Sequence, residues 1–135
     1  VPSINELSKV VLSTANTTII PFMPKKLVFD QLGSTIRTVQ KVKKFYNPDL
    51  QIAGVLPVAM DHTLKADKEY FEAMEQIALT ESLPILPVIK RSTFIEKAAD
   101  SGKSVIQYRS KESKQLSEPF RELAHMIRTA RGDSV

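Results

Sequence analysis

The stretch that decides the fold runs Leu86-Pro87-Val88-Ile89-Lys90-Arg91-Ser92-Thr93-Phe94-Ile95-Glu96-Lys97-Ala98-Ala99-Asp100-Ser101-Gly102-Lys103-Ser104-Val105-Ile106. An apolar run typical of a strand ends in two cations, and a Ser/Thr pair then begins a short helix. Glu96 stands three residues after Thr93, as in a capping box, and Gly102 ends the helix before a second β-branched run. In a doubly wound sheet the loops at the carboxyl ends of strands bind ligands. Lys90, Arg91 and Ser92 are therefore predicted at the functional edge, with an ordinary surface loop as the alternative.

The rest of the chain alternates between helical and strand patterns. Apolar side chains recur at helical spacing over 3–15, 27–46, 64–81 and 113–131. Apolar or β-branched runs predict strands over 17–22, 50–60, 83–89 and 105–108. Pro57 is expected at an end, bulge or edge of its strand. This order predicts an α/β fold: one domain over 1–135 with a mostly parallel sheet and helices on both faces.

Composition narrows the class of protein. The chain has 135 residues, of which 42% are hydrophobic, so one globular domain is expected. Nineteen Lys and Arg against 15 Asp and Glu give a net charge of +4, which is compatible with a polyanionic partner. No cysteine occurs and the two histidines are isolated, so no metal site is expected. The sequence shows neither a membrane-spanning run nor a secretory leader, so a cytoplasmic setting is expected.

No set of residues predicts catalysis. A phosphate-binding loop needs the pattern G-x-x-x-x-G-K-[ST], and none of the four glycines is arranged in that way. Gly102-Lys103-Ser104 copies only the end of the pattern and precedes a predicted strand instead of a helix. No strand ending in a magnesium-binding aspartate is apparent. His62 reads as a solvated loop residue and His125 as a structural one, so no catalytic residue is assigned and the chain alone is not expected to hydrolyse ATP.

Several segments resemble the ParA/Soj-type partition ATPases, the deviant Walker family that includes MinD. Ile89-Lys90-Arg91-Ser92 through Ile106 resembles a late segment of that family, although Lys90 replaces a proline and Phe94 stands where some members have arginine. Asn47 to Leu56, followed by Met60-Asp61, resembles an earlier strand and the loop after it. Val1-Pro2-Ser3 and Asn16 to Phe22 resemble the run that follows the Walker B aspartate. The chain is therefore interpreted as the carboxyl-terminal half of a P-loop NTPase fold, a partial doubly wound sheet lacking the P-loop half.

The resemblance implies specific roles. It places Met60, Asp61, Lys90 and Arg91 on the adenine side of a nucleotide site. It also implies binding to DNA without sequence preference, through cations that a phosphate backbone would contact: Arg91, Arg109, Lys111, Lys114, Arg121 and Arg128. ATP and Mg are expected cofactors of the full-length family protein, and neither is expected to bind tightly to this chain alone.

The resemblance also implies partners: the missing amino-terminal half, a second copy in a homodimer, DNA of the nucleoid and a ParB-like centromere-binding protein. No membrane partner is expected. Because Ile19, Ile20 and Phe22 are too apolar for a solvent-facing edge, one edge of the sheet is expected to be left unpaired where the other half would dock.

Three alternatives stay open. A MinD-like positioning ATPase has the same superfamily signature, but the segment 128–135 lacks the apolar face of a membrane helix. A stand-alone binding module without nucleotide chemistry is the second. The third is that the cations serve only solubility. No aromatic residue is interleaved with them, so recognition of single strands is disfavoured.

Overall fold

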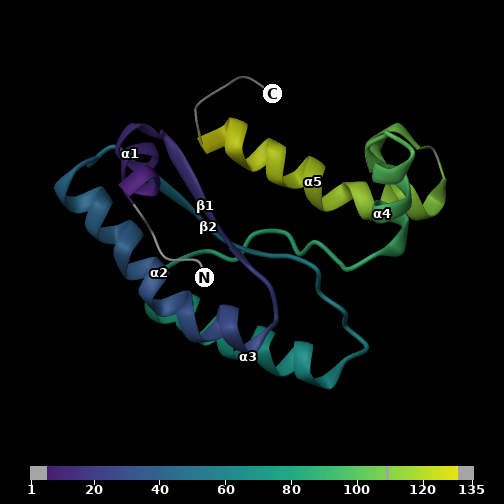
Figure 1. Ribbon diagram of the computed structural model, residues 1–135, viewed down its shortest axis with the longest axis horizontal. Helices are drawn as coiled ribbons and strands as arrows, with labels where there is room; N and C mark the ends of the chain where they lie inside the picture. Colours follow the sequence, from purple (N-terminus) through teal and green to yellow (C-terminus); the bar gives the residue numbers. More distant parts are fainter. Residues whose placement is uncertain (1–5, 109, 131–135) are drawn as a thin grey trace.

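The computed structural model describes residues 6–108 and 110–130. In chain order its elements are α1 (Glu6–Thr14), β1 (Thr17–Phe22), α2 (Lys26–Phe45), β2 (Gln51–Pro57), α3 (Lys65–Thr80), α4 (Thr93–Asp100), the 3₁₀ helix η1 (Val105–Gln107) and α5 (Lys111–Ala130). Figure 1 shows α2 and α3 on one side of the strands and α5 along the other. The predicted α/β fold with helices on both faces is therefore confirmed.

The sheet is parallel and centred on β2. Strand β1 pairs with β2, and the partners shift between Thr18↔Ile52 and Ile19↔Gly54, which leaves Ala53 as an extra residue in β2. On its other side β2 receives an extended segment through two isolated parallel bridges, Val55↔Ile85 and Met60↔Lys90. This segment is the strand predicted over 83–89. It stays irregular because Pro84 and Pro87 have no amide hydrogen for the ladder.

Gly54 allows this third segment to approach. Its φ is +144°, and a Cβ placed there would lie 2.4 Å from the carbonyl oxygen of Pro84. That same oxygen accepts a hydrogen bond from the amide of Val55 at 2.9 Å. A side chain at position 54 would therefore push the third segment away from β2.

The core lies between the sheet and the two helices α2 and α3. Its buried members come from both strands and both helices: Ile20, Phe22, Leu32, Ile36, Val55, Met74 and Ala78. Burying a side chain of this size stabilises the fold by roughly 1.5–3 kcal/mol. No helix among the described residues is apolar over a length that could cross a lipid bilayer.

Two of the local predictions need correction. The strand predicted over 105–108 is wrong, because Val105–Gln107 forms a 3₁₀ turn in which the Ser104 amide donates to Oε1 of Gln107 at 2.7 Å. The short helix α4 is capped by Ser92, whose hydroxyl accepts from the amide of Phe94 at 3.0 Å, so Thr93 and Glu96 do not form the predicted capping box. The predicted start of α1 at residue 3 and its capping box, and the helix end at Gly132, lie outside the described residues.

Helices α3 and α4 each end in a left-handed turn of the same type. After α3, Ser82 has φ +56°, its amide donates to Leu79 O, and the Leu83 amide donates to Ala78 O. After α4, Gly102 has φ +72° and the same pair of bonds is formed by the amides of residues 102 and 103. Both ends are Schellman motifs, but only the second has the glycine that this conformation favours.

We predict opposite effects of substitution at these two turns. Ser82→Gly should stabilise the fold by about 0.5–1 kcal/mol, because it removes the steric cost of the left-handed conformation. Gly102→Ala should destabilise it by about 1 kcal/mol, and only through the backbone, since no atom lies within 4 Å of the added Cβ. The measurement is urea unfolding of both variants beside the unmodified chain. Equal midpoints for all three would contradict the assignment.

Candidate functional site

Two loops meet at the carboxyl edge of the parallel strands. The amide of Met60 donates to Ile89 O at 3.2 Å, and the amide of Arg91 donates to Met60 O at 2.8 Å. These bonds hold the loop after β2 against the loop that leads into α4. They bring together Met60, Asp61, Lys90 and Arg91, the four residues that the family resemblance implies at the adenine side of a nucleotide site.

The four residues do not present equivalent groups. Lys90 and Arg91 are exposed, and Asp61 is half-buried. Met60 is only 1% exposed, so its side chain belongs to the core and its main chain alone is part of the edge. Ser92, the next residue, uses its hydroxyl oxygen to cap α4.

Asp61 is kept ionised by its own loop. Its Oδ1 accepts from the hydroxyl of Thr63 at 2.6 Å and from the amide of Thr63 at 3.0 Å. These two bonds, with a smaller electrostatic contribution from the neighbouring Arg91, lower the pKa of Asp61 below its ordinary value of 3.8. The edge therefore carries one fixed negative charge beside two exposed cations.

A second carboxylate, not singled out by the sequence patterns, supports the same loop. Asp67 lies in the first turn of α3, is 4% exposed, and accepts the amide hydrogen of Asp61 on Oδ2 at 3.0 Å. The sequence did offer one signal, an acid in the first turn of a predicted helix. Acids at that position are common because they interact favourably with the helix dipole, so the signal does not by itself point to a loop contact.

The loop also contains a strained residue. Ala59 has φ +54°, in the left-handed region that residues with a Cβ seldom adopt. Such strain persists only where neighbouring contacts hold the backbone in place. Here those contacts are the hydrogen bonds of Met60 and Asp61.

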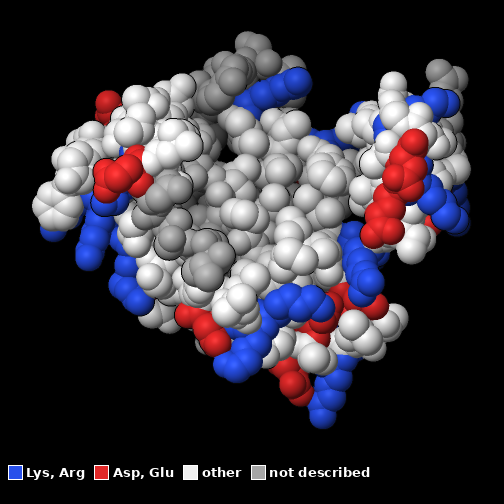
Figure 2. All heavy atoms as spheres, in the orientation of Figure 1, with Lys and Arg blue, Asp and Glu red and all other residues white. Residues whose placement is uncertain are grey.

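The cations predicted to contact DNA lie mainly along α5. Lys111, Lys114, Arg121 and Arg128 are exposed, and three of them, at 114, 121 and 128, recur every seven residues, so they share one side of the helix. Arg91 belongs to the strand-end loops instead, and Arg109 lies outside the described residues. Figure 2 shows basic and acidic side chains around the rim of one face and mostly uncharged ones across its centre.

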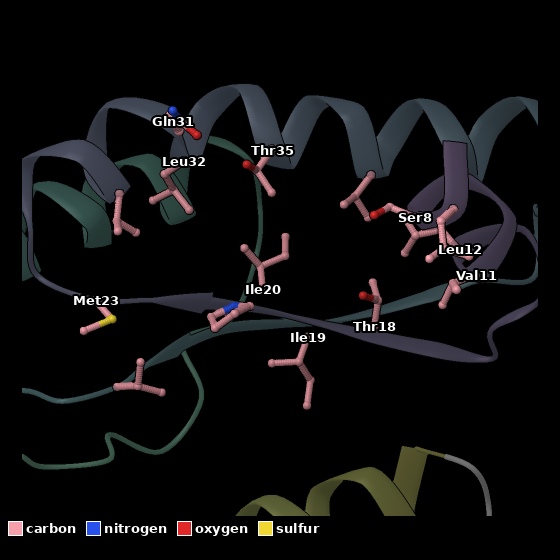
Figure 3. A pocket seen from close by; sticks show the side chains of 15 residues that line it. Ser8, Val11, Leu12, Thr18, Ile19, Ile20, Met23, Gln31, Leu32 and Thr35 are labelled. Atoms are coloured by element: carbon pink, nitrogen blue, oxygen red, sulfur yellow. The ribbon is translucent and has the colours of Figure 1, made fainter. Parts of the chain in front are cut away.

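An apolar groove lies beside the free side of β1. It has a volume of about 730 Å³ and is lined mainly by residues from α1, β1 and α2, together with Met23 and Val58. Figure 3 shows Val11 and Leu12 of α1, Ile20 of β1 and Leu32 of α2 around this space. Within the described part of the chain α1 has no buried residue, and β1 pairs with no strand other than β2.

The groove leaves large apolar side chains in contact with water. Leu7 is 71% exposed and Val11 is 55% exposed. Patches of this kind on a folded protein usually mark an interaction surface. Within the described residues β1 pairs only with β2, so its other side matches the edge that was predicted to be unpaired.

Comparisons with known proteins identify the fold. No family model matches the sequence, and no curated protein does either. Among solved structures, apo McdA from Cyanothece is similar with a TM-score of 0.76 and 22% identity, over 93% of this chain and 50% of McdA. A Cyanothece McdA variant in complex with ATP gives 0.75 and 21%, over 96% of this chain and 48% of that protein.

A second kind of protein shares part of this fold. Cobyrinic acid a,c-diamide synthase from Mycobacterium smegmatis, with bound ADP and magnesium, has a TM-score of 0.56 and 25% identity, over 76% of this chain and 46% of that protein. The chain thus spans about half the length of these proteins. Its fold is that of part of a P-loop NTPase, in the arrangement found in McdA, a ParA/MinD-type deviant Walker ATPase.

We predict that the low pKa of Asp61 depends on the Thr63 hydroxyl. Thr63→Val removes that donor while leaving the backbone donor, so the pKa of Asp61 should rise toward 3.8. Because the folded pKa is depressed, the contribution of Asp61 to stability is complete above the unfolded pKa and is lost as the pH falls through the folded value. NMR titration of the Asp61 carboxyl group measures the shift. Thr80→Val, on an exposed part of α3, is the control, and an unchanged Asp61 pKa in Thr63→Val would contradict the prediction.

Proposed function

We propose that this chain is the carboxyl-terminal half of a ParA-like positioning or partition ATPase. In this role it contributes the adenine side of the nucleotide site and a surface that binds DNA without sequence preference. Support comes from the shared fold with McdA, one of whose solved structures contains ATP, and with a synthase solved with ADP and magnesium. This chain covers about half the length of each McdA structure, which agrees with the role of a half-domain.

The observation that carries this proposal is the pair of hydrogen-bonded loops at the carboxyl edge of the sheet. In open parallel sheets, ligands bind outside the carboxyl ends of the strands. The Met60 amide is already bonded to Ile89 O, so the chain offers there the second lone pair of the Met60 carbonyl oxygen, the Asp61 carboxylate and the exposed cations Lys90 and Arg91. The carbonyl oxygen suits an amino group of a heterocyclic base, and the cations suit the phosphates or a DNA backbone.

The phosphate chemistry must come from elsewhere. Gly102-Lys103-Ser104 is the only glycine–lysine–serine run in the sequence, and Gly102 closes the carboxyl-terminal end of α4. At a helix carboxyl terminus the unpaired groups are carbonyl oxygens, which repel phosphate, whereas a P-loop presents amide groups at a helix amino terminus. Another polypeptide segment would have to supply that loop.

The free side of β1 fits that segment. A strand added there would pair with the side of β1 that no described strand occupies and would cover the groove lined by Val11, Leu12 and Ile20. Such an addition would bring a phosphate loop next to the same carboxyl edge if the strand is parallel to β1. The amino-terminal half of the protein is the proposed occupant.

We expect Arg91→Ala to weaken nucleotide binding about tenfold, because a charge-assisted contact is lost. The measurement is binding of a fluorescent ATP analogue to the protein expressed from its complete reading frame, with unlabelled ATP and GTP as competitors. Residues 1–135 alone should show no ATP turnover, for want of a phosphate loop.

Lys97→Ala, which removes an exposed cation on α4, is the matched control and should leave affinity unchanged. Equal affinities for Arg91→Ala and the unmodified protein would exclude Arg91 from the site. Turnover by residues 1–135 that a substitution within them abolishes would contradict the half-domain role.

The DNA surface is proposed along the row of cations on α5. Phosphate contacts by lysine and arginine need no sequence recognition, and the number of such contacts sets the salt dependence of affinity. Arg121→Ala together with Arg128→Ala should lower the slope of log affinity against log salt by about 1.8 on duplex DNA, at about 0.9 for each contact. Lys65→Ala with Lys68→Ala on α3 removes the same charge and should not change the slope. Identical slopes for both pairs would refute the α5 surface.

The other expectations drawn from the resemblance stay predictions. They are a homodimer, a ParB-like centromere-binding partner and a location on the nucleoid in the cytoplasm. The MinD-like alternative predicts an amphipathic membrane helix at the carboxyl end, a segment that lies mostly outside the described residues.

A further inference from the structure

Asp67 is a buried acid with an unusual partner. A carboxylate that is 4% exposed needs hydrogen-bond donors to offset the loss of water. Acids in the first turn of a helix usually accept from amides of that same turn. Asp67 instead accepts from the amide of Asp61, six residues earlier and outside the helix, while Leu64 caps α3 without a side-chain bond. Its bond thus joins α3 to the loop after β2.

The loop that Asp67 holds would not keep its shape unaided. Ala59 is in the left-handed region, and Met60 is packed in the core. Between Ala59 and the start of α3 the backbone is held by the two Met60 bonds to the second loop, by the Thr63 amide on Asp61 Oδ1, by the Leu64 amide on Asp61 O at 3.1 Å, and by the Asp61–Asp67 bond. Among these, the Asp61–Asp67 bond ties the loop to a side chain of α3, and removing the Asp67 carboxylate leaves the Asp61 amide without its acceptor.

The effect of Asp67 extends to the second loop. Met60 is adjacent to Asp61, and its carbonyl oxygen accepts the amide hydrogen of Arg91 at 2.8 Å. Asp61 is therefore connected to Arg91 through two main-chain steps, and Met60 between them is also held by its amide bond to Ile89 O. Arg91 leads directly into Ser92, which caps α4.

We propose that Asp67 is a positioning residue: it holds the loop after β2 in its strained conformation and thereby sets Asp61 and Arg91 relative to one another for a bound nucleotide. The consequence for binding rests on the proposed function above, whereas the structural coupling does not. Asp67 touches no ligand in this scheme and acts only through the amide of Asp61.

The test compares three substitutions of Asp67 in the protein expressed from its complete reading frame. Asp67→Ala removes the acceptor, Asp67→Asn keeps an oxygen acceptor of the same reach, and Asp67→Glu moves the acceptor by one methylene. Amide hydrogen exchange is followed by NMR at Asp61 and Arg91, with Ala78 in the middle of α3 as an internal reference. Exchange at Asp61 and Arg91 should rise about tenfold in Asp67→Ala, less in Asp67→Glu, and least in Asp67→Asn, with Ala78 unchanged in all three.

If Asp67 only stabilised the fold as a whole, Asp67→Ala would raise exchange at the amides of Asp61, Arg91 and Ala78 together. Glu72→Ala, which removes an exposed acid of the same helix, should change none of them. Affinity for the fluorescent ATP analogue should follow the order of exchange at Arg91, with Asp67→Asn close to the unmodified protein.

Each outcome bears on the proposal. An unprotected Asp61 amide in the unmodified protein would overturn it, as would unchanged exchange at Asp61 and Arg91 in both Asp67→Ala and Asp67→Glu. If Asp67→Ala does not fold, Asp67→Glu and Asp67→Asn decide alone. Altered exchange with no nucleotide binding by any version would support the positioning role and overturn the proposed function instead.

Discussion

The hydrogen bonds on both sides of β2 are the interaction on which the rest of the structure depends. On one side β2 pairs with β1, and on the other the amide of Val55 donates to Pro84 O while the amide of Leu86 donates to Val55 O. The close approach of Pro84 is possible because Gly54 has no side chain. Further along, the same contact continues through Pro57 O, which accepts from Ile89, and reaches Met60 and Arg91. The candidate site is thus the end of a main-chain ladder.

The same main-chain hydrogen bonds hold the loops that carry Asp61, Lys90 and Arg91, although these loops are not regular strands. Loops that carry function are usually mobile, whereas here each of the two loops supplies a hydrogen bond to the other. Asp61 adds local order because both donors to its Oδ1 belong to Thr63. The buried carboxylate of Asp67 accepts from the Asp61 amide and so joins this loop to α3. The edge combines a hydrogen-bonded backbone with exposed cations, an arrangement suited to a charged ligand.

The side of β1 that faces away from β2 differs from the carboxyl edge, because it is apolar instead of charged. Among residues 6–108 and 110–130, helix α1 contributes no buried residue, and the side of β1 away from β2 pairs with no strand and lies next to an apolar groove. A complete domain seldom leaves such an edge open, because unpaired strands promote association. The solved structures with this fold are about twice as long as this chain. The half-domain proposed above would account both for the exposed apolar groove and for the lack of a phosphate-loop pattern in the sequence.

The local sequence determined the elements whose formation needs few distant partners. Helical spacing predicted α2, α3 and α5 within a few residues of their observed bounds, and the alternation of elements predicted a parallel sheet. Gly102 was correctly expected to end α4 because its left-handed turn is a local requirement. The order of strands and helices likewise placed Lys90 and Arg91 at the carboxyl edge, whereas Met60 and Asp61 were assigned to it only by the family resemblance.

Only the tertiary structure decided features that depend on a partner distant in sequence. The β-branched run at Val105 forms a 3₁₀ turn because a strand needs a neighbour that can bond to it, and no strand pairs with it among the described residues. The segment after Ser82 is irregular because two prolines lack donors, although β2 still binds it. The burial of Met60 and the bond of the buried Asp67 to the Asp61 amide depend on how elements distant in sequence come together, which periodicity does not encode. Side-chain patterns specify which face of an element is apolar, but hydrogen bonds between elements specify which groups remain free to act.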